Sequence, residues 1–281
     1  MSAKTEIAWC DSSVNPAVGC SGCELPKCYA RLLVGRYAGQ TGWPASFDKP
    51  ELFLDRIKKA LKWPDLTGKD RPDKPWLDGK SRHIFWCDLG EPFDPQLPED
   101  WLAPYLPMLS DSPHVHIFCT KRPDRARLFF ERHRSPRNLI LLTTVTSDAT
   151  QKRAWDLLSV PVFTRGLSLE PLIGPVDLDK YELLCKEWRR GFTIGTYLDW
   201  VIVGGESGPG ARPCRVEWIR SVVEQCAAAS VPIFIKQMGS YWARVENASI
   251  ESWEQVDRKG SDPDQWLDDL RVRQMPEVRN A

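Results

Sequence analysis

The chain has no excess charge of either sign and no long apolar run, and these two absences limit the classes of protein to which it can belong. Its 281 residues carry 38 Lys and Arg against 38 Asp and Glu, so no overall field draws it toward a polyanion or a membrane surface. No window approaches the roughly 20 apolar residues of a membrane-spanning helix, and the N-terminal segment lacks the apolar stretch of a secretion signal. We therefore expect a globular, cytoplasmic protein with no membrane partner.

Histidine is also scarce, and none of the four histidines lies within the first 80 residues. Paired C-x2-C knuckles, a repeat period and low-complexity tracts are absent too, which disfavours zinc ribbons, solenoids and disordered tails. Cysteine, in contrast, occurs nine times. An odd number of cysteines in a cytoplasmic chain favours thiols, metal ligands or catalytic groups over disulfides.

Three of the cysteines, Cys20, Cys23 and Cys28, form a C-x2-C-x4-C cluster on one short segment. Three thiolates on one loop can hold three irons of a 4Fe–4S cluster and leave the fourth iron open. An open iron can bind S-adenosylmethionine and cleave its sulfonium bond with one electron from an external reductant. The alternative is a zinc site with Cys10 or another residue as the fourth ligand, and the missing histidines and knuckles make it the weaker interpretation.

Short β-branched or aromatic runs alternate with amphipathic stretches along the chain. Most runs are continuously apolar, as is typical of strands buried on both faces of a parallel sheet. The expected strands are His83 to Cys87, Val115 to Cys119, Leu139 to Val145, Val160 to Thr164, Trp200 to Val203 and Val231 to Ile235, with one more near Ile7 to Val18. The expected helices are Glu51 to Leu61, Asp100 to Leu109, Asp124 to Arg132, Ala149 to Leu158 and Val216 to Ala229.

This alternation predicts right-handed crossovers and an α/β fold, a parallel and at least partial TIM-like barrel of about six to eight strands. No change of composition marks a convincing domain boundary. We expect one barrel domain over residues 1–249, with the cysteines in an N-terminal loop (residues 10–30) and a surface insertion at residues 66–80. Residues 250–281 are expected to form an irregular C-terminal extension.

Polar side chains follow most of the expected strands. In a parallel barrel, functional residues gather where strands end, because the loops there converge on one face over a rigid core. The polar residues near these ends include Asp88, Glu91, Lys121, Arg122, Thr143, Thr144, Thr146, Ser168, Glu170, Glu206, Ser207, Lys236 and Gln237. Each alone can equally be a cap or a salt-bridge partner, but together they predict a shared cavity, with Lys121, Glu170, Glu206 and Lys236 as candidate catalytic groups.

A set of short strings along most of the chain resembles a known family. The strings are Trp9, Asn15-Pro16, Gly19-Cys20, Cys28-Tyr29-Ala30, Phe93-Asp94-Pro95, Thr120-Lys121-Arg122-Pro123, Ser168 to Leu172, Gly174-Pro175-Val176, Val203 to Pro213, Lys236-Gln237 and Gly239. Together they resemble the phage Gp37/Gp68 proteins, also described as three-Cys-motif proteins of unknown function and grouped with radical SAM-type barrels. The cysteine spacing departs from that family, whose middle cysteine lies closer to the last one, and from the C-x3-C-x2-C of most radical SAM enzymes.

The resemblance to radical SAM barrels implies a residue that binds the methionine amine of S-adenosylmethionine, on the loop after the strand that follows the cysteines. Gly90 and Glu91 stand at that place. A carboxylate there can accept from the ammonium, and a glycine lets the backbone approach closely. The alternative for Glu91 is an ordinary capping residue of the loop.

The resemblance further implies that Glu170 and Glu206 bind the ribose, the amine or a substrate. Gly204, Gly205 and Ser207 would complete the cofactor site, although a diglycine serves equally well in a tight turn. Lys121, Arg122 and Lys236 would be available for a carboxylate or phosphate. Ser207 lacks a full G-x-S-x-G string and no histidine follows it, so serine hydrolase chemistry is disfavoured.

A second hypothesis comes from a different class: a metal-stabilised nucleic-acid-binding or DNA-repair-associated protein of phage type. It depends on a run of cations whose members are Lys121, Arg122, Arg125, Arg127, Arg132, Arg134 and Arg137. Such a run could contact phosphates, but a solvated helix face is the more common explanation. The substrate stays open between a nucleic acid or nucleotide, an amino acid, a peptide and a small metabolite.

Overall fold

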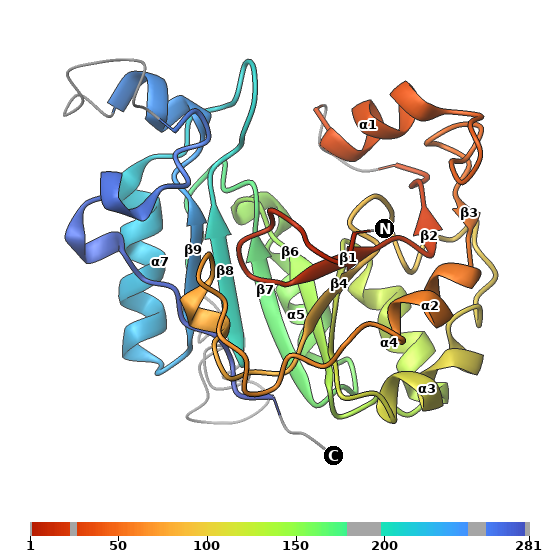
Figure 1. Cartoon of the computed structure of the whole chain (residues 1–281). Helices are drawn as coiled ribbons and strands as arrows, with labels where there is room; N and C mark the ends of the chain where they lie inside the picture. The colour runs from red at the N-terminus through yellow and green to blue at the C-terminus, as the bar shows by residue number, and fades with distance from the viewer. Residues whose placement is uncertain (1, 23–26, 179–197, 247–256, 279–281) are drawn as a thin grey trace, which may run out of the picture. The chain divides into compact units, whose positions relative to one another are not determined.

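The computed structural model describes residues 2–22, 27–178, 198–246 and 257–278 (Figure 1). The chain forms two compact units. Unit 1 comprises Met1–Thr143, Ser159–Thr164 and Val278–Ala281, and unit 2 comprises Thr144–Leu158 and Arg165–Glu277. The predicted division at residue 249/250 lies within residues 247–256, outside the described part, and the single-domain assignment stays a prediction.

Unit 1 is built on four parallel strands in the order β1 (Ser12–Val14), β4 (His83–Trp86), β5 (Val115–Thr120) and β6 (Leu139–Thr144). Almost every residue of these strands is buried, as the continuous apolar runs predicted. In the register of the sheet, Ile84 pairs with His116 and Ile117 with Ile140. The predicted strands at His83 to Cys87, Val115 to Cys119 and Leu139 to Val145 are therefore confirmed, and the one expected near Ile7 to Val18 contains β1.

The other elements of unit 1 depart from the sequence expectation in two places. The helix expected over Glu51 to Leu61 is shorter, α2 (Asp55–Ala60), because Glu51–Leu52 form β3, antiparallel to β2 (Ala17–Val18). The helix expected over Asp100 to Leu109 is broken into η2 (Ala103–Tyr105) and α3 (Leu106–Ser110), each of which has a proline in its first turn.

Two further helices of unit 1 begin next to predicted site residues. The helix α1 (Tyr29–Tyr37) was not predicted and begins one residue after Cys28. The helix α4 (Pro123–Arg132) agrees with the prediction and starts with a proline at its first position, where the missing N–H costs nothing. These two helices therefore begin directly after Cys28 and after Arg122, the two segments that carry the predicted site of this unit.

The segment predicted as a surface insertion is held against the N-terminal residues by two half-buried cations. The ammonium of Lys74, one residue before η1 (Pro75–Leu77), donates to the carbonyls of Thr5, Ile7 and Cys10 at 2.7, 2.8 and 2.6 Å. The Nε of Arg71 lies 3.0 Å from Asp11 Oδ1. Because Lys74 binds backbone carbonyls and Arg71 binds a carboxylate just before β1, the segment 66–80 holds the entry into the sheet.

Unit 2 contains three parallel strands in the order β7 (Thr164–Leu169), β8 (Trp200–Gly204) and β9 (Ile233–Gln237). The prediction of a strand at Val160 to Thr164 was wrong, and the strand predicted to begin at Val231 begins two residues later. In both places a proline, Pro161 or Pro232, precedes the observed strand and cannot donate to a ladder.

Helices and the C-terminal segment flank these strands. The turn η3 (Asp148–Thr150) leads into α5 (Lys152–Leu158), and α7 (Val216–Ala228) packs against β8 (Figure 1). After η6 (Trp242–Glu246), η7 (Pro263–Gln265) and η8 (Asp268–Leu270), the chain returns to β9, where Phe234 and Arg273 form an antiparallel bridge. The C-terminal segment thus covers the open edge of β9, which protects its backbone from other chains.

Parallel strands alternate with helices in both units, so the predicted α/β class is confirmed. None of the helices within the described ranges combines the length and the hydropathy that a bilayer span requires.

Candidate functional site

The start of the cysteine loop lies directly against the loop that follows β4. Gly19 and Gly90 form a parallel bridge, in which Gly19 N donates to Leu89 O at 3.0 Å and Glu91 N donates to Gly19 O at 3.1 Å. A Cβ on Gly90 would lie 2.7 Å from Ala17 O, and one on Gly19 would lie 2.7 Å from Phe47 O. Only glycine fits at either position, so the predicted need for a close backbone approach at Gly90 is met by the protein's own chain.

Two of the three predicted metal ligands share one apolar environment. Cys20 and Cys28 are half-buried and pack against a cluster of buried residues that comprises Val18, Ala30, Val34, Phe47 and Leu89. Cys23 lies outside the described residues. Within the described ranges, no three His, Cys, Asp or Glu side chains gather as a metal-ligand set.

The loop between Cys20 and Cys23 is held by two side chains from neighbouring strand ends. Asp94, in the loop after β4, accepts from Ser21 N through Oδ2 at 2.7 Å. Arg122, at the end of β5, places Nη2 3.4 Å from both Ser21 Oγ and Gly22 O. These contacts bring an anion and a cation to the predicted cluster loop.

Glu91 is a buried carboxylate, only 4 % exposed, that joins the ends of β4 and β5. Its Oε1 accepts from the hydroxyl of Thr120 at 2.5 Å and from Phe93 N at 3.1 Å, and its Oε2 accepts from Lys121 N at 2.8 Å. Burial raises the pKa of Glu91, and the bonds from Thr120 and Lys121 oppose that rise. Three of the roughly four acceptor positions of a carboxylate are therefore used within the protein.

Two other predicted groups, Glu170 and Lys236, meet in unit 2. Glu170 follows β7 directly and Lys236 lies in β9, and their Oε1 and Nζ atoms are 2.7 Å apart. Ser168 Oγ lies 3.3 Å from the other carboxylate oxygen of Glu170. The pair is largely buried, so a ligand that reached it would meet a carboxylate and an ammonium with little competing water.

Glu206 forms a separate ion pair just beyond β8. Both of its oxygens accept from the guanidinium of Arg212, at 2.9 Å from Nε and 2.7 Å from Nη2, and Oε2 also accepts from Arg212 N at 2.8 Å. The hydrogen bonds to Glu206 raise the pKa of Arg212. Such a bidentate pair closes the loop of residues 206–212 into a fixed shape.

The predicted diglycine is packed against the protein's own backbone. A Cβ on Gly205 would lie 2.2 Å from Met238 O, whereas one on Gly204 would lie no closer than 3.4 Å to any atom. The side chain of Gln237 donates to Gly205 O at 2.7 Å. Ser207, the next predicted residue, is exposed. Gly205 is therefore required by the close approach of the backbone at Met238 and Gly239, and its role toward a cofactor stays a prediction.

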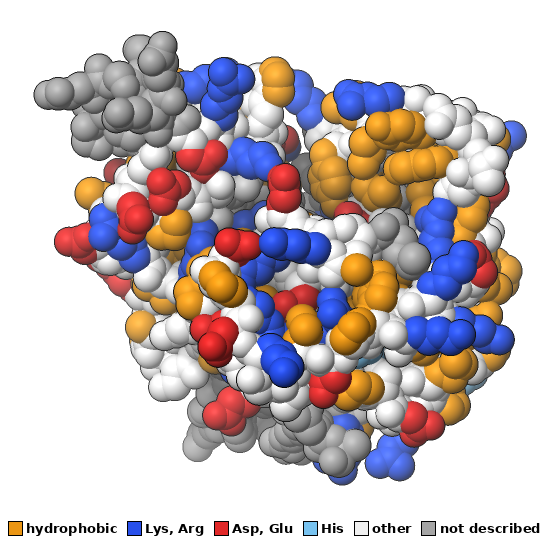
Figure 2. All heavy atoms as spheres, viewed as in Figure 1, with side chains coloured by type: hydrophobic (Ala, Val, Ile, Leu, Met, Phe, Trp, Pro, Cys, Tyr) orange, Lys and Arg blue, Asp and Glu red, His pale blue; other side chains and the backbone are white. Residues whose placement is uncertain are grey.

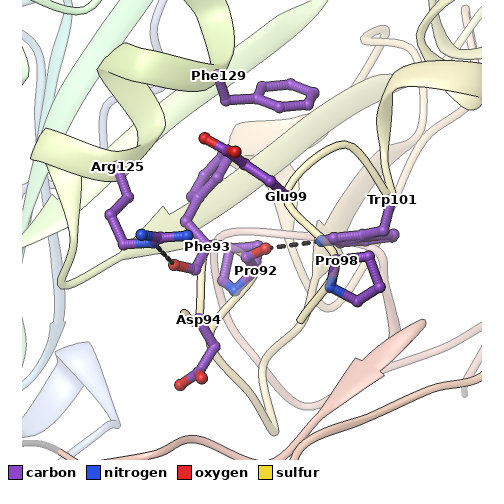
Figure 3. A pocket seen from close by; sticks show the side chains of 8 residues that line it. All are labelled: Pro92, Phe93, Asp94, Pro98, Glu99, Trp101, Arg125 and Phe129. Carbon is purple, nitrogen blue, oxygen red and sulfur yellow. Dashed lines mark hydrogen bonds between the residues drawn. The ribbon is translucent and has the colours of Figure 1, made fainter. Parts of the chain in front are cut away.

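A small hollow beside the loop of Asp94 is lined by Pro92, Phe93, Asp94, Pro98, Glu99, Trp101, Arg125 and Phe129 (Figure 3). Two hydrogen bonds close it, from Arg125 Nε to Phe93 O at 3.0 Å and from Trp101 Nε1 to Pro92 O at 2.8 Å. It has room for about one water molecule. The hollow is thus a part of the packing that supports Asp94 and not a place for a substrate.

The surface next to the cysteine loop is apolar. Figure 2 shows apolar side chains gathered over α1, where Tyr29 is 62 % exposed and Leu32 is 71 % exposed. Tyr29 follows Cys28 in the chain and donates its hydroxyl to Asp88 O. The last predicted ligand therefore borders an apolar face on one side and the strand-end loop on the other.

The sequence arguments missed two residues that shape these sites, Asp94 and Arg212. Both lie in strings that resemble the phage family, but neither was given a role. The only signal for Asp94 is its position three residues after Glu91, within the loop of a strand end. No local sequence pattern marks Arg212, because its pairing with Glu206 becomes visible only in the folded loop.

Comparison with known proteins gives one match. The chain matches the family described as Protein of unknown function (DUF5131) over residues 4–276. No curated protein and no solved structure matches it. Because the match covers almost all of the 281 residues, the chain belongs to this family of proteins of unknown function.

Proposed function

We propose that the chain is an iron–sulfur enzyme in which Cys20, Cys23 and Cys28 hold a 4Fe–4S cluster that cleaves S-adenosylmethionine. The observation that carries the proposal is the shared environment of Cys20 and Cys28, which pack on one apolar cluster beside the loops that follow β4 and β5. The fold in this proposal is a partial TIM-like barrel of the radical SAM kind, related to the phage Gp37/Gp68 proteins. Parallel strands within each unit support it.

The donor set suits such a cluster. Thiolates are the ligands of iron–sulfur clusters, and three of them leave one iron open. The open iron supplies the chemistry, which is the one-electron cleavage of the sulfonium bond with an electron from an external reductant. An apolar surrounding limits access of water to such a group. Cys20 and Cys28 have this surrounding.

The residues of this chain would bind and orient the ligands. In the proposal, Glu91 accepts from the methionine amine with its remaining acceptor position, and the cations Lys121 and Arg122 offer donors to a carboxylate or phosphate. The position of Glu91 between the ends of β4 and β5, fixed by three donors, supports a role that requires a stationary carboxylate.

The residues of unit 2 would serve the substrate. Glu170 and Lys236 form a pair that can donate to and accept from a polar group. Glu206 has both oxygens engaged by Arg212, so its part in the proposal is to shape the loop that carries Ser207 and directly follows Gly204 and Gly205.

Anaerobic reconstitution tests the proposal. The wild-type chain should bind about four irons with inorganic sulfide and form 5′-deoxyadenosine only with reductant. Ser substitutions at Cys20, Cys23 and Cys28 should each lower the iron content. The matched control is Cys119→Ser, because Cys119 is half-buried like Cys20 and Cys28 but lies outside the motif. A colourless protein that binds zinc and forms no such product would overturn the proposal.

The second hypothesis, nucleic-acid binding through the arginine run, receives less support. Arg127 pairs with Glu131 at 2.6 Å, and Arg132 lies 2.9 Å from Glu99. Arg125 donates to Phe93 O. These arginines are engaged with protein groups, as on a solvated helix face. Steeply salt-dependent binding to an oligonucleotide would nevertheless favour this hypothesis.

A further inference from the structure

The backbone of the cysteine loop is held by a carboxylate to which the proposed function gives no role. Asp94 is 1 % exposed. Its Oδ2 accepts from Ser21 N at 2.7 Å and its Oδ1 accepts from Gln96 N at 2.9 Å. A buried carboxylate with backbone donors on both oxygens is fixed in place, because any movement would leave a charge without partners in a poorly hydrated site.

Other contacts fix the same short segment. Cys20 N donates to Phe47 O at 2.8 Å, which sets the backbone one residue before Ser21. Arg122 Nη2 reaches Ser21 Oγ and Gly22 O, each at 3.4 Å, which sets the backbone on the following side. Of these contacts, the one between Asp94 and Ser21 N is the shortest.

We propose that Asp94 is a positioning residue that sets the direction in which the cysteine loop presents its thiolates. Ser21 follows Cys20 directly, so a fixed Ser21 peptide restrains the backbone on the C-terminal side of this ligand. The purpose of this role rests on the proposed function, whereas the hold on Ser21 does not require any metal.

Cysteine alkylation in the metal-free, folded chain measures that hold directly. In Asp94→Ala the loss of a charge-assisted hydrogen bond should raise the alkylation rate of Cys20 by about tenfold or more. Asp94→Asn keeps one acceptor oxygen and should give a smaller rise. Ser21→Ala is the matched control, since it removes the hydroxyl that Arg122 contacts but keeps the N–H that Asp94 binds. Cys10, which is 0 % exposed, reports any opening of unit 1 as a whole.

A rise confined to the cysteine loop in Asp94→Ala, absent in Ser21→Ala, supports the proposal. An equal rise at Cys10 would show that Asp94 only stabilises unit 1, and no rise at Cys20 would show that the loop does not depend on Asp94; either result overturns the proposal. In reconstituted protein, Asp94→Asn should also shift the cluster midpoint potential upward, because a nearby negative charge is removed. Absence of iron and sulfide from the wild type would overturn the proposed function, and alkylation would still decide the role of Asp94.

Discussion

Replacement of Gly205 by alanine should destabilise unit 2 much more than the same replacement at its neighbour Gly204. The added Cβ at Gly205 would lie 2.2 Å from Met238 O, 2.8 Å from Met238 C and 2.9 Å from Gly239 Cα. All three are backbone atoms of the two residues that directly follow β9, so no side chain can rotate away to relieve the clash.

The magnitude follows from the cost of overpacking, about 1–3 kcal/mol and more where backbone must move. At about 2–4 °C per kcal/mol, Tm should fall by about 2–12 °C. Gly204→Ala is the control, because its Cβ would meet Gln237 at 3.4 Å, which is ordinary van der Waals contact. The free energy of unfolding of that variant should stay within about 1 kcal/mol of the wild-type value. Alanine lowers the conformational entropy of the unfolded chain, which favours the folded state and offsets part of any loss.

Thermal unfolding followed by circular dichroism, together with urea unfolding at 25 °C, measures both variants. The reasoning would be refuted by equal stabilities of Gly205→Ala and Gly204→Ala, or by a larger loss at Gly204. Either result would mean that the backbones of β8 and β9 do not meet at Gly205 and Gly239.

Three further predictions concern unit 1. Burial lowers the pKa of His83 to about 4 and that of His116 to about 3, whereas a histidine in the unfolded chain has a pKa of about 6.5, so below pH 6.5 the unfolded chain binds more protons than the folded one. The free energy of unfolding should therefore be at its full value above pH 6.5 and should fall by about 1.4 kcal/mol per pH unit for each histidine as the pH is lowered toward 4. Equal free energies of unfolding in urea at pH 7 and pH 5 would contradict this prediction. Lys74→Ala leaves three carbonyls without their donor, at about 1–3 kcal/mol per carbonyl, so it should lower the free energy of unfolding by several kcal/mol. Lys4→Ala is the control, because it breaks only an exposed ion pair and should lower the free energy of unfolding by about 0–1 kcal/mol in the same assay. Glu91→Ala removes the acceptor of three donors and should lower Tm more than Glu91→Gln, which keeps one acceptor oxygen; the opposite order in calorimetry would exclude a structural role for these bonds.

Much of the fold was predictable, because buried parallel strands leave continuous apolar runs. The runs at His83, Val115 and Leu139 became strands where they were expected. The error at Val160 has a physical cause: Pro161 interrupts the ladder, and the true strand contains Arg165 and Gly166, which carry no strand signal.

The candidate site was predictable as a set of positions but not as a set of partners. Strand ends identified Glu91, Glu170, Glu206 and Lys236, but the ion pair between Glu170 and Lys236 was not predicted. That Glu206 pairs with Arg212 depends on the path of a loop, which leaves no periodic trace in a sequence. Close approach at a glycine was likewise foreseeable, but not that the approaching group would be another stretch of the same chain.

The contact between Gly19 and Gly90 has a mechanical consequence. Where two backbone segments are in direct contact, no side chain lies between them that could change its rotamer and absorb a displacement. A shift of either peptide is therefore passed to the other almost undiminished. A displacement of the turn after β4 would therefore move Gly19 and, with it, the backbone of Cys20, the next residue in the chain.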